Sequence, residues 1–170
     1  YFIVPDSLKS IKETLNILAS ETFSAVSAPI QYAAIKAYKT DHKKYIDSSR
    51  KILGAIGNYV YENLNSNNVL INKPQGGFYL MPEFISAKFN TSSDMCKNIL
   101  EMTGDALLPG SDFGFDKKRM IARLSFTDFD GKILMEKYEE NKILDNELIK
   151  NFAPKIAEGT EKLKKWSESI

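Results

Sequence analysis

The feature that most constrains the fold is a series of short apolar segments in the middle of the chain. Val69–Ile71 and Gly77–Met81 have the length and residue types of strands, and Lys73–Gly76 between them has the residues of a turn. The sequence therefore predicts that these two strands pair as a hairpin. Two more strands are predicted at Ala106–Leu108 and Met120–Phe126.

Helices are expected around these strands. A helix capped by Ser93 or Asp94 should reach about Thr103, where Gly104 ends it, and the chain beyond Gly131 reads as helical with a break near 141–146. Short strands separated and followed by helices are typical of an α+β fold. We therefore expect helices packed on one face of a small, mostly antiparallel sheet.

The first 66 residues follow a different pattern. Apolar residues recur at helical spacing over 7–20 and 27–38, and again over 41–65, which predicts a helix of roughly 35 Å at 1.5 Å per residue. Tyr1–Val4 is strand-like and would need partner strands from elsewhere, so the chain reads as the later part of a longer protein. The expected organisation is a helical segment 1–40, a linking helix 41–66 and an α+β domain 67–170.

Composition excludes several classes of protein. With 43% hydrophobic and 26% charged residues the chain is an ordinary globular sequence, and its net charge of +1 gives no long-range attraction for nucleic acid or an anionic membrane. No run of about twenty apolar residues could span a bilayer. The single cysteine cannot form an internal disulfide, so a reducing, cytoplasmic setting is expected.

Arg123 is the residue that points most directly to a function. It lies in the middle of the otherwise apolar run Met120–Phe126. A guanidinium in an apolar setting is costly unless an anion meets it, so Arg123 is expected to face a site for a carboxylate or phosphate. The alternative is an arginine that pairs with an internal acid.

Other residues that commonly carry chemistry have simpler explanations. His42 is the only histidine and belongs to a charged run typical of a solvated helix start. Cys96 lies on the apolar face of a predicted helix, where plain burial explains it. A serine or cysteine nucleophile with a histidine base is therefore not expected, and no histidine or cysteine spacing suits zinc.

Three segments together resemble a known family. They are Lys73–Leu80 with its paired glycines before Phe-Tyr-Leu, Leu107–Gly114 with its Leu-Pro-Gly, and Ile121–Phe126 with its arginine. Their order and spacing are similar to the C-terminal part of class I and II aminotransferases, pyridoxal-phosphate enzymes of the aspartate aminotransferase type. Ser20–Ala34 also looks like the family segment that follows the cofactor lysine, so the resemblance covers about residues 1–130.

The resemblance implies a fold and an assembly. The chain would comprise the C-terminal small domain of a fold-type I pyridoxal-phosphate transferase, preceded by the last helices of its large domain. The parent enzyme would be a homodimer that uses pyridoxal 5'-phosphate to move an amino group from an amino acid to a 2-keto acid.

The resemblance also implies roles for a few residues. Arg123 matches the arginine that grips the substrate carboxylate. Gly76 and Gly77 match glycines of a turn near the substrate, although a purely conformational role would explain them equally well. Ser24 matches a loop that lies close to the cofactor of the other subunit in such dimers.

The chain departs from the family pattern in two ways. The family's Schiff-base lysine motif is absent, because Tyr1 looks like the last residue of the run that follows that lysine, and Lys9 and Lys12 on a surface-like helix are no substitutes. Lys132–Lys155 adds more helix than a typical member carries and reads as an insertion. The isolated chain is therefore expected to be inactive and to supply substrate orientation and domain closure to its parent.

Two other readings remain open. The chain could be a non-catalytic α+β module in which Arg123 binds an amino acid or keto acid. It could also be a subunit-interaction domain that contacts a partner through Phe115, Tyr138 and Trp166, although an aromatic content of 11% does not favour this.

Overall fold

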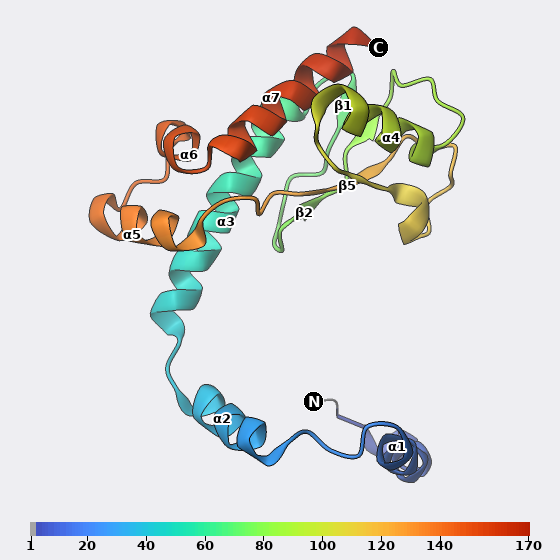
Figure 1. Ribbon diagram of the computed structural model, residues 1–170, viewed down its shortest axis with the longest axis vertical. Coiled ribbons are helices and arrows are strands. Elements are labelled where there is room, and N and C mark those ends of the chain that lie inside the picture. Colours follow the sequence, from blue (N-terminus) through green and yellow to red (C-terminus); the bar gives the residue numbers. More distant parts are fainter. Residues whose placement is uncertain (1–2) are drawn as a thin grey trace. The chain divides into compact units, whose positions relative to one another are not determined.

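The computed structural model describes residues 3–170, which divide into two compact units, Tyr1–His42 and Lys43–Ile170 (Figure 1). The first unit contains a 3-10 turn and two helices: η1 Asp6–Leu8, α1 Lys9–Thr22 and α2 Ala28–Lys39. The second contains the sheet and the remaining helices: α3 Lys43–Leu64, β1 Val69–Leu70, β2 Tyr79–Leu80, β3 Glu83–Phe84, α4 Ser92–Thr103, β4 Leu108–Pro109, η2 Gly110–Phe113, β5 Ala122–Ser125, α5 Gly131–Asn141, α6 Asn146–Phe152 and α7 Pro154–Ser169.

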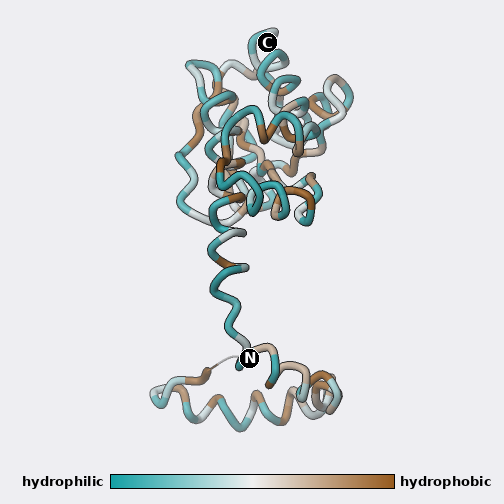
Figure 2. Tube along the Cα trace, turned by 90° about the vertical axis from the view of Figure 1, so that its left-hand side faces the viewer, coloured by the Kyte–Doolittle hydropathy of each residue, from teal (hydrophilic) through white to brown (hydrophobic). Residues whose placement is uncertain are grey.

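The two helices of the first unit bury none of their residues. Apolar and polar positions alternate along them (Figure 2), and large apolar side chains such as Ile17, Phe23 and Ile30 are more than half exposed. The strand predicted at Tyr1–Val4 falls partly on residues 1 and 2, which lie outside the described residues, and Ile3 and Val4 are not in a strand.

In the second unit, α7 packs along α3 and also contacts α4 and α6 (Figure 1). The apolar stripe of α3, including Ile52, Ile56 and Val60, is buried in the core of the second unit. Gly57 lets α3 approach the sheet, because a Cβ there would lie 3.0 Å from the Phe126 ring. That close approach offsets the roughly 1 kcal/mol that a glycine costs inside a helix.

All strand pairs are antiparallel. β1 pairs with β3, and β5 lies between β2 and β4, with Tyr79 opposite Ser125 and Leu108 opposite Arg123. A single bridge between Glu83 and Ile121 joins the two groups of strands. Leu80, Phe84 and Leu124 are buried on the side of the helices, whereas their neighbours along the strands, Tyr79, Glu83 and Arg123, are more exposed. This is the expected α+β fold, with helices on one face of a small antiparallel sheet.

The predicted hairpin between 69–71 and 77–81 is wrong. Val69 instead pairs with Phe84, and Tyr79–Leu80 pairs with β5. The reason is Phe84, which is fully buried and belongs to a strand that the sequence reading missed. Pro82 accepts a hydrogen bond from the Ala122 amide through its carbonyl, so the chain continues past this proline along β5.

Candidate functional site

Strand β5 carries Arg123 on the open face of the sheet. Side chains alternate across a strand, so the burial of Ala122 and Leu124 among the helices places Arg123 and Ser125 on the opposite face. Arg123 is half-buried there. The apolar neighbours of Arg123 along the chain face the helices, so its guanidinium does not lie in the apolar core.

Two aromatic rings hold the Arg123 guanidinium. Its Cζ lies 4.3 Å from the centroid of the Tyr79 ring and 4.3 Å from that of the Phe113 ring. A cation over an aromatic face within about 6 Å is attracted by the ring quadrupole. No carboxylate in residues 3–170 forms an ion pair with Arg123, so these contacts restrict the guanidinium without neutralising it.

The internal ion pair that could have explained Arg123 is found at Arg119 instead. Its Nε donates to Oε1 of Glu83 at 2.9 Å and its terminal nitrogen donates to Oε2 at 2.5 Å. This two-pronged hydrogen bond lowers the pKa of Glu83 and raises the pKa of Arg119. Arg119 and Arg123 are four residues apart but have different partners. The guanidinium of Arg119 pairs with Glu83, whereas that of Arg123 contacts, within the described residues, only the rings of Tyr79 and Phe113.

The Leu-Pro-Gly loop brings Phe113 to Arg123. The Gly110 amide donates to the Ile121 carbonyl at 2.7 Å, and a Cβ on Gly110 would lie 2.9 Å from the Ile121 Cβ. Only glycine fits this approach without a shift. The loop is therefore fixed against the start of β5, and η2, which follows, carries Phe113 at its end.

The two turn glycines before Tyr79 differ from each other. Gly77 has a φ of +71°, a conformation that residues with a Cβ rarely adopt, whereas Gly76 has no such requirement. A Cβ on either would meet nothing within 4 Å. The structure gives Gly77 a conformational reason to be glycine, and a role of either residue beside a substrate stays a prediction.

Ser24 belongs to the first unit, whereas the elements that build the Arg123 site belong to the second. It follows α1 in a left-handed conformation with φ 60°, and its hydroxyl donates to the Ser20 carbonyl at 3.4 Å. A non-glycine residue in this conformation costs on the order of 1–2 kcal/mol. Such strain is a feature of functional loops, and it is compatible with the predicted role of Ser24.

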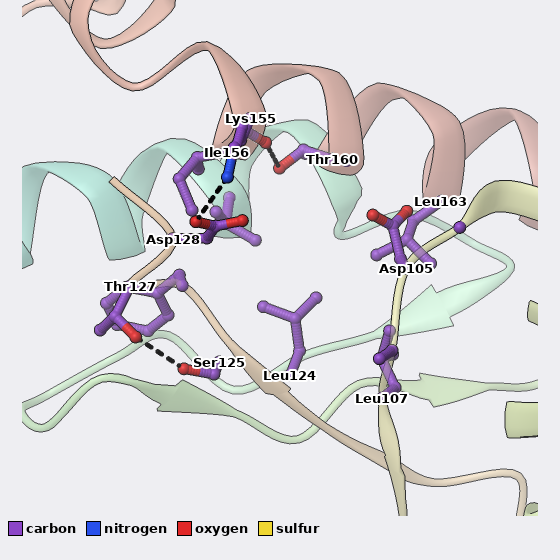
Figure 3. Close-up of a pocket in the computed structure, with 15 residues that line it drawn as sticks. Asp105, Leu107, Leu124, Ser125, Thr127, Asp128, Lys155, Ile156, Thr160 and Leu163 are labelled. Atoms are coloured by element: carbon purple, nitrogen blue, oxygen red, sulfur yellow. Dashed lines mark hydrogen bonds and ion pairs between the residues drawn. The ribbon is translucent and has the colours of Figure 1, made fainter. Parts of the chain in front are cut away.

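A cavity of about 420 Å³ lies between α7 and the segment that contains β5 (Figure 3). Its apolar wall includes Leu107, Leu124 and Leu163, and Lys155 forms an ion pair with Asp128 at 3.2 Å. Arg123 does not line it. The cavity is therefore separate from the site on the open face.

Asp105 is the unusual group in this cavity. Its Oδ2 is buried and accepts no hydrogen bond within the described residues, and loss of water raises the pKa of the carboxyl, against smaller lowering effects of Thr103 and Lys162. Its Oδ1 would lie 2.9 Å from a Cβ on Gly159, so the glycine in α7 leaves room for this carboxylate.

The other reactive residue types are placed as follows. Cys96 is buried and free, and burial raises the pKa of its thiol to about 11. His42 is exposed, with Nε2 2.9 Å from the Ala37 carbonyl. Residues 3–170 contain no cluster of three histidine, cysteine or carboxylate side chains suited to a metal, and none of their helices is long and apolar enough to cross a membrane.

The sequence reading named Arg123 but missed the two rings beside it. Tyr79 and Phe113 come from segments that were already noted for their glycines, and an aromatic residue in each was the available signal. What the sequence could not give was the register that places Tyr79 diagonally across from Arg123.

Comparison with known proteins identifies the family. The model of aminotransferase class I and II matches residues 1–132. The chain belongs to this family. It is 25% identical over 149 residues to an aspartate aminotransferase of Sulfolobus acidocaldarius, covering 84% of this chain and 36% of that protein. It is 30% identical over 123 residues to an aspartate aminotransferase of Thermotoga maritima, covering 71% of this chain and 29% of that protein.

Solved aminotransferases share the fold of this family member. An alanine aminotransferase from Pyrococcus furiosus aligns with a TM-score of 0.72 at 20% identity, over 97% of this chain and 36% of that chain. The Thermotoga maritima aspartate aminotransferase structure aligns with a TM-score of 0.62 at 22% identity, over 93% of this chain and 33% of that chain. The chain thus spans about a third of the length of the relatives it matches.

Proposed function

We propose that the chain is the substrate-orienting part of a pyridoxal-phosphate-dependent aminotransferase, in which Arg123 binds the carboxylate of an amino acid or 2-keto acid. The observation that supports this is an arginine on the open face of the sheet, in contact with Tyr79 and Phe113 and paired with no acid of the described chain. A carboxylate can accept two parallel N–H bonds from one guanidinium, which fixes its position and its plane.

The residues around Arg123 are suited to bind the substrate, but none of them could form the covalent bond that holds the cofactor. The elements beside it, β2, β4, β5 and η2, contain no lysine. Pyridoxal phosphate, when bound, supplies an electron sink for the bond that breaks at the α-carbon. The lysine that holds it therefore comes from outside these elements, and we place it in the part of the parent enzyme that this chain does not span.

The remaining assignments extend this proposal to the assembly. Residues 1–40 would belong to the large cofactor domain, 41–66 would link the domains, and 67–170 would close on the substrate to exclude water. Gly76 and Gly77 would lie beside the substrate, and Ser24 would approach the cofactor of the second subunit in a homodimer. The exposed apolar side chains of α1 and α2 support a further packing partner for these helices. A cytoplasmic location accords with the free thiol of Cys96.

The subunit-interaction alternative loses two of its three contact residues. Tyr138 and Trp166 are 7% and 6% exposed, so both belong to the core of the second unit. The binding-module alternative differs from the proposal in one measurable way, because only a complete module would bind an amino acid or keto acid without the rest of the parent enzyme.

The decisive experiment compares two arginine substitutions in the full-length parent enzyme. Arg123→Ala should lower kcat/KM for transamination by roughly tenfold to a hundredfold, the equivalent of about 1.5–3 kcal/mol for a charged hydrogen-bonded pair. Arg119→Ala removes the same charge four residues away, where Glu83 already engages it, and should leave kcat/KM near the parent value. Equal effects of the two substitutions would refute the assignment of Arg123.

A second measurement separates the enzyme from the binding module. Calorimetry of the 170-residue chain with glutamate and 2-oxoglutarate should give no saturable heat at millimolar concentration, because the cofactor and the other substrate contacts are absent. Saturable binding that Arg123→Ala abolishes would favour the module instead.

A further inference from the structure

The segment that follows the family match builds a second, separate pocket against α3. The family model ends at residue 132, just after the start of α5. From there, Tyr138, Lys142 and Leu144 form one wall of a pocket of about 610 Å³. The opposite wall comes from α3, against which α5 packs (Figure 1). Helices α5 and α6 therefore form, with α3, an open pocket whose volume lies in the size range of small-molecule sites, about 300–1,000 Å³.

The charge of this pocket is positive. Arg50, Lys51 and Lys142 line it, and Glu62 is the single acid among its lining residues. The ammonium groups of Lys51 and Lys142 lie 5.8 and 5.3 Å from the centroid of the same Tyr138 ring. Tyr138 thus contacts one lysine from each wall of the pocket.

Neighbouring acids have closer partners than these cations. Asp47 forms an ion pair with Lys43, one turn away on α3. Glu139 lies 2.8 Å from Lys44 and 3.7 Å from Lys142, so its nearest partner is Lys44. Asp145 lies next to Asn146 of the lining and caps α6, where its Oδ1 accepts from the Leu148 amide at 2.8 Å. Within residues 3–170, Arg50 and Lys51 thus form no ion pair, and Lys142 shares Glu139 with Lys44.

The backbone presents Lys142 at a measurable cost. Lys142 ends α5 in a left-handed conformation with φ 57°, and its amide donates to the Tyr138 carbonyl at 2.8 Å. Glycine or asparagine is the usual choice at such a helix end. A lysine there is explained if its ammonium group has a ligand to bind.

The rest of the lining suits the uncharged part of a ligand. Ala55, Leu144 and Ile149 supply apolar surface. Asn58 also lines the pocket, and its Oδ1 is buried and accepts no hydrogen bond in the described part of the chain. The terminal torsion of an asparagine is broad, so a modest rotation would let this amide meet a ligand hydroxyl.

We infer that the pocket between α3 and the α5–α6 segment binds a phosphorylated small molecule of about the size of a nucleoside monophosphate. Three cations that line one pocket match a dianionic phosphate better than a single carboxylate, since arginine offers a planar fork and each lysine a mobile point charge. The apolar wall and Asn58 receive the organic part. The site does not depend on the proposed role of Arg123, which lies on a different element.

Calorimetry on the 170-residue chain tests the site with four probes: AMP, ribose 5-phosphate, adenosine and inorganic phosphate. AMP should bind saturably and at least about tenfold more tightly than adenosine or inorganic phosphate, because both parts of the ligand contribute. Ribose 5-phosphate distinguishes a sugar phosphate from a nucleotide as the ligand. Added salt should weaken binding, since the contacts are charged and partly exposed.

A matched pair of double variants tests the residues. Lys51→Gln with Lys142→Gln removes two pocket cations and should weaken the tightest phosphate ligand by about tenfold or more. Lys97→Gln with Lys165→Gln makes the same change of charge on exposed lysines outside the pocket and should leave binding unchanged. Arg50→Gln gives an independent loss if the first variant fails to fold. The absence of saturable binding by both phosphate esters at millimolar concentration, or equal binding by the two double variants, overturns the proposal.

Discussion

The guanidinium carbon of Arg123 lies 4.3 Å from the centre of the Tyr79 ring, although 43 residues separate the two along the chain. The contact follows from strand register: Tyr79 opposes Ser125, so it is the diagonal neighbour of Arg123 on the same face of the sheet. Phe113 adds a second ring at the same distance. The two contacts restrict the guanidinium while leaving its charge available to an anion.

The ring of Tyr79, and not its hydroxyl, should matter for substrate binding. In the parent enzyme, Tyr79→Leu should lower kcat/KM by roughly twofold to thirtyfold, because a cation–π contact contributes about 0.5–2 kcal/mol to holding the arginine. Tyr79→Phe keeps the ring and should behave like the parent. Steady-state kinetics over a range of substrate concentrations checks both, and a loss with Tyr79→Phe as large as with Tyr79→Leu would contradict this role of the ring.

Gly76 and Gly77 are neighbours that differ in backbone conformation, because only Gly77 has a positive φ. Gly77→Ala should destabilise the chain by about 1–2 kcal/mol, because φ +71° forces a Cβ against its own backbone. Gly76→Ala should be neutral or stabilise by a few tenths of a kcal/mol, since its Cβ meets open space and alanine narrows the unfolded ensemble. Urea unfolding followed by circular dichroism gives both values, and equal effects would show that φ at Gly77 is not the constraint.

Helices were predictable from this sequence because their evidence is local. Apolar residues at helical spacing placed the long helix at 41–65, and the structure has it at Lys43–Leu64. Gly104 was expected to end the preceding helix and does so with φ +81°. The strands were also located approximately, but their pairing was not. Val69 pairs with Phe84 because Phe84 packs in the core. The local sequence of a two-residue strand does not indicate which strand it will pair with.

The candidate site was predictable only in part for the same reason. A lone arginine in an apolar strand is visible in sequence, so Arg123 could be named. Which face it occupies depends on which neighbours the helices cover, and Phe113 reaches it through the close contact of Gly110 with Ile121. These relationships join segments far apart in the chain, so they require the folded structure.

The ionisation of Asp105 and that of Glu83 should make the free energy of unfolding depend on pH in opposite directions. Burial raises the pKa of Asp105 in the folded chain above the ordinary value that it has in the unfolded chain. At a pH between these two pKa values, the folded state therefore binds the proton more tightly than the unfolded state does. Stability from this group therefore falls as pH rises through that window and returns on acidification. Asp105→Asn should remove this trend, and urea unfolding from weakly acidic to neutral pH would measure it.

Glu83 provides the control of opposite sign. The hydrogen bond from Arg119 lowers the pKa of Glu83, so its contribution to stability is present above the ordinary glutamate pKa and is lost as pH falls through the lowered one. Glu83→Gln should abolish that loss. If both substitutions changed the pH profile in the same direction, the assigned environments of the two carboxyls would be wrong.

Cys96 should react with thiol reagents only when the chain opens. It is 6% exposed, and burial raises the pKa of its thiol to about 11, so at pH 8 roughly a thousandth of it is thiolate. Ellman's reagent should therefore label the folded chain far more slowly than it labels free cysteine, and the rate should rise with urea in step with unfolding. Because the chain has one cysteine, Cys96→Ala supplies the blank for this signal. Rapid, complete labelling in buffer without urea would mean that α4 exposes this face in the native state.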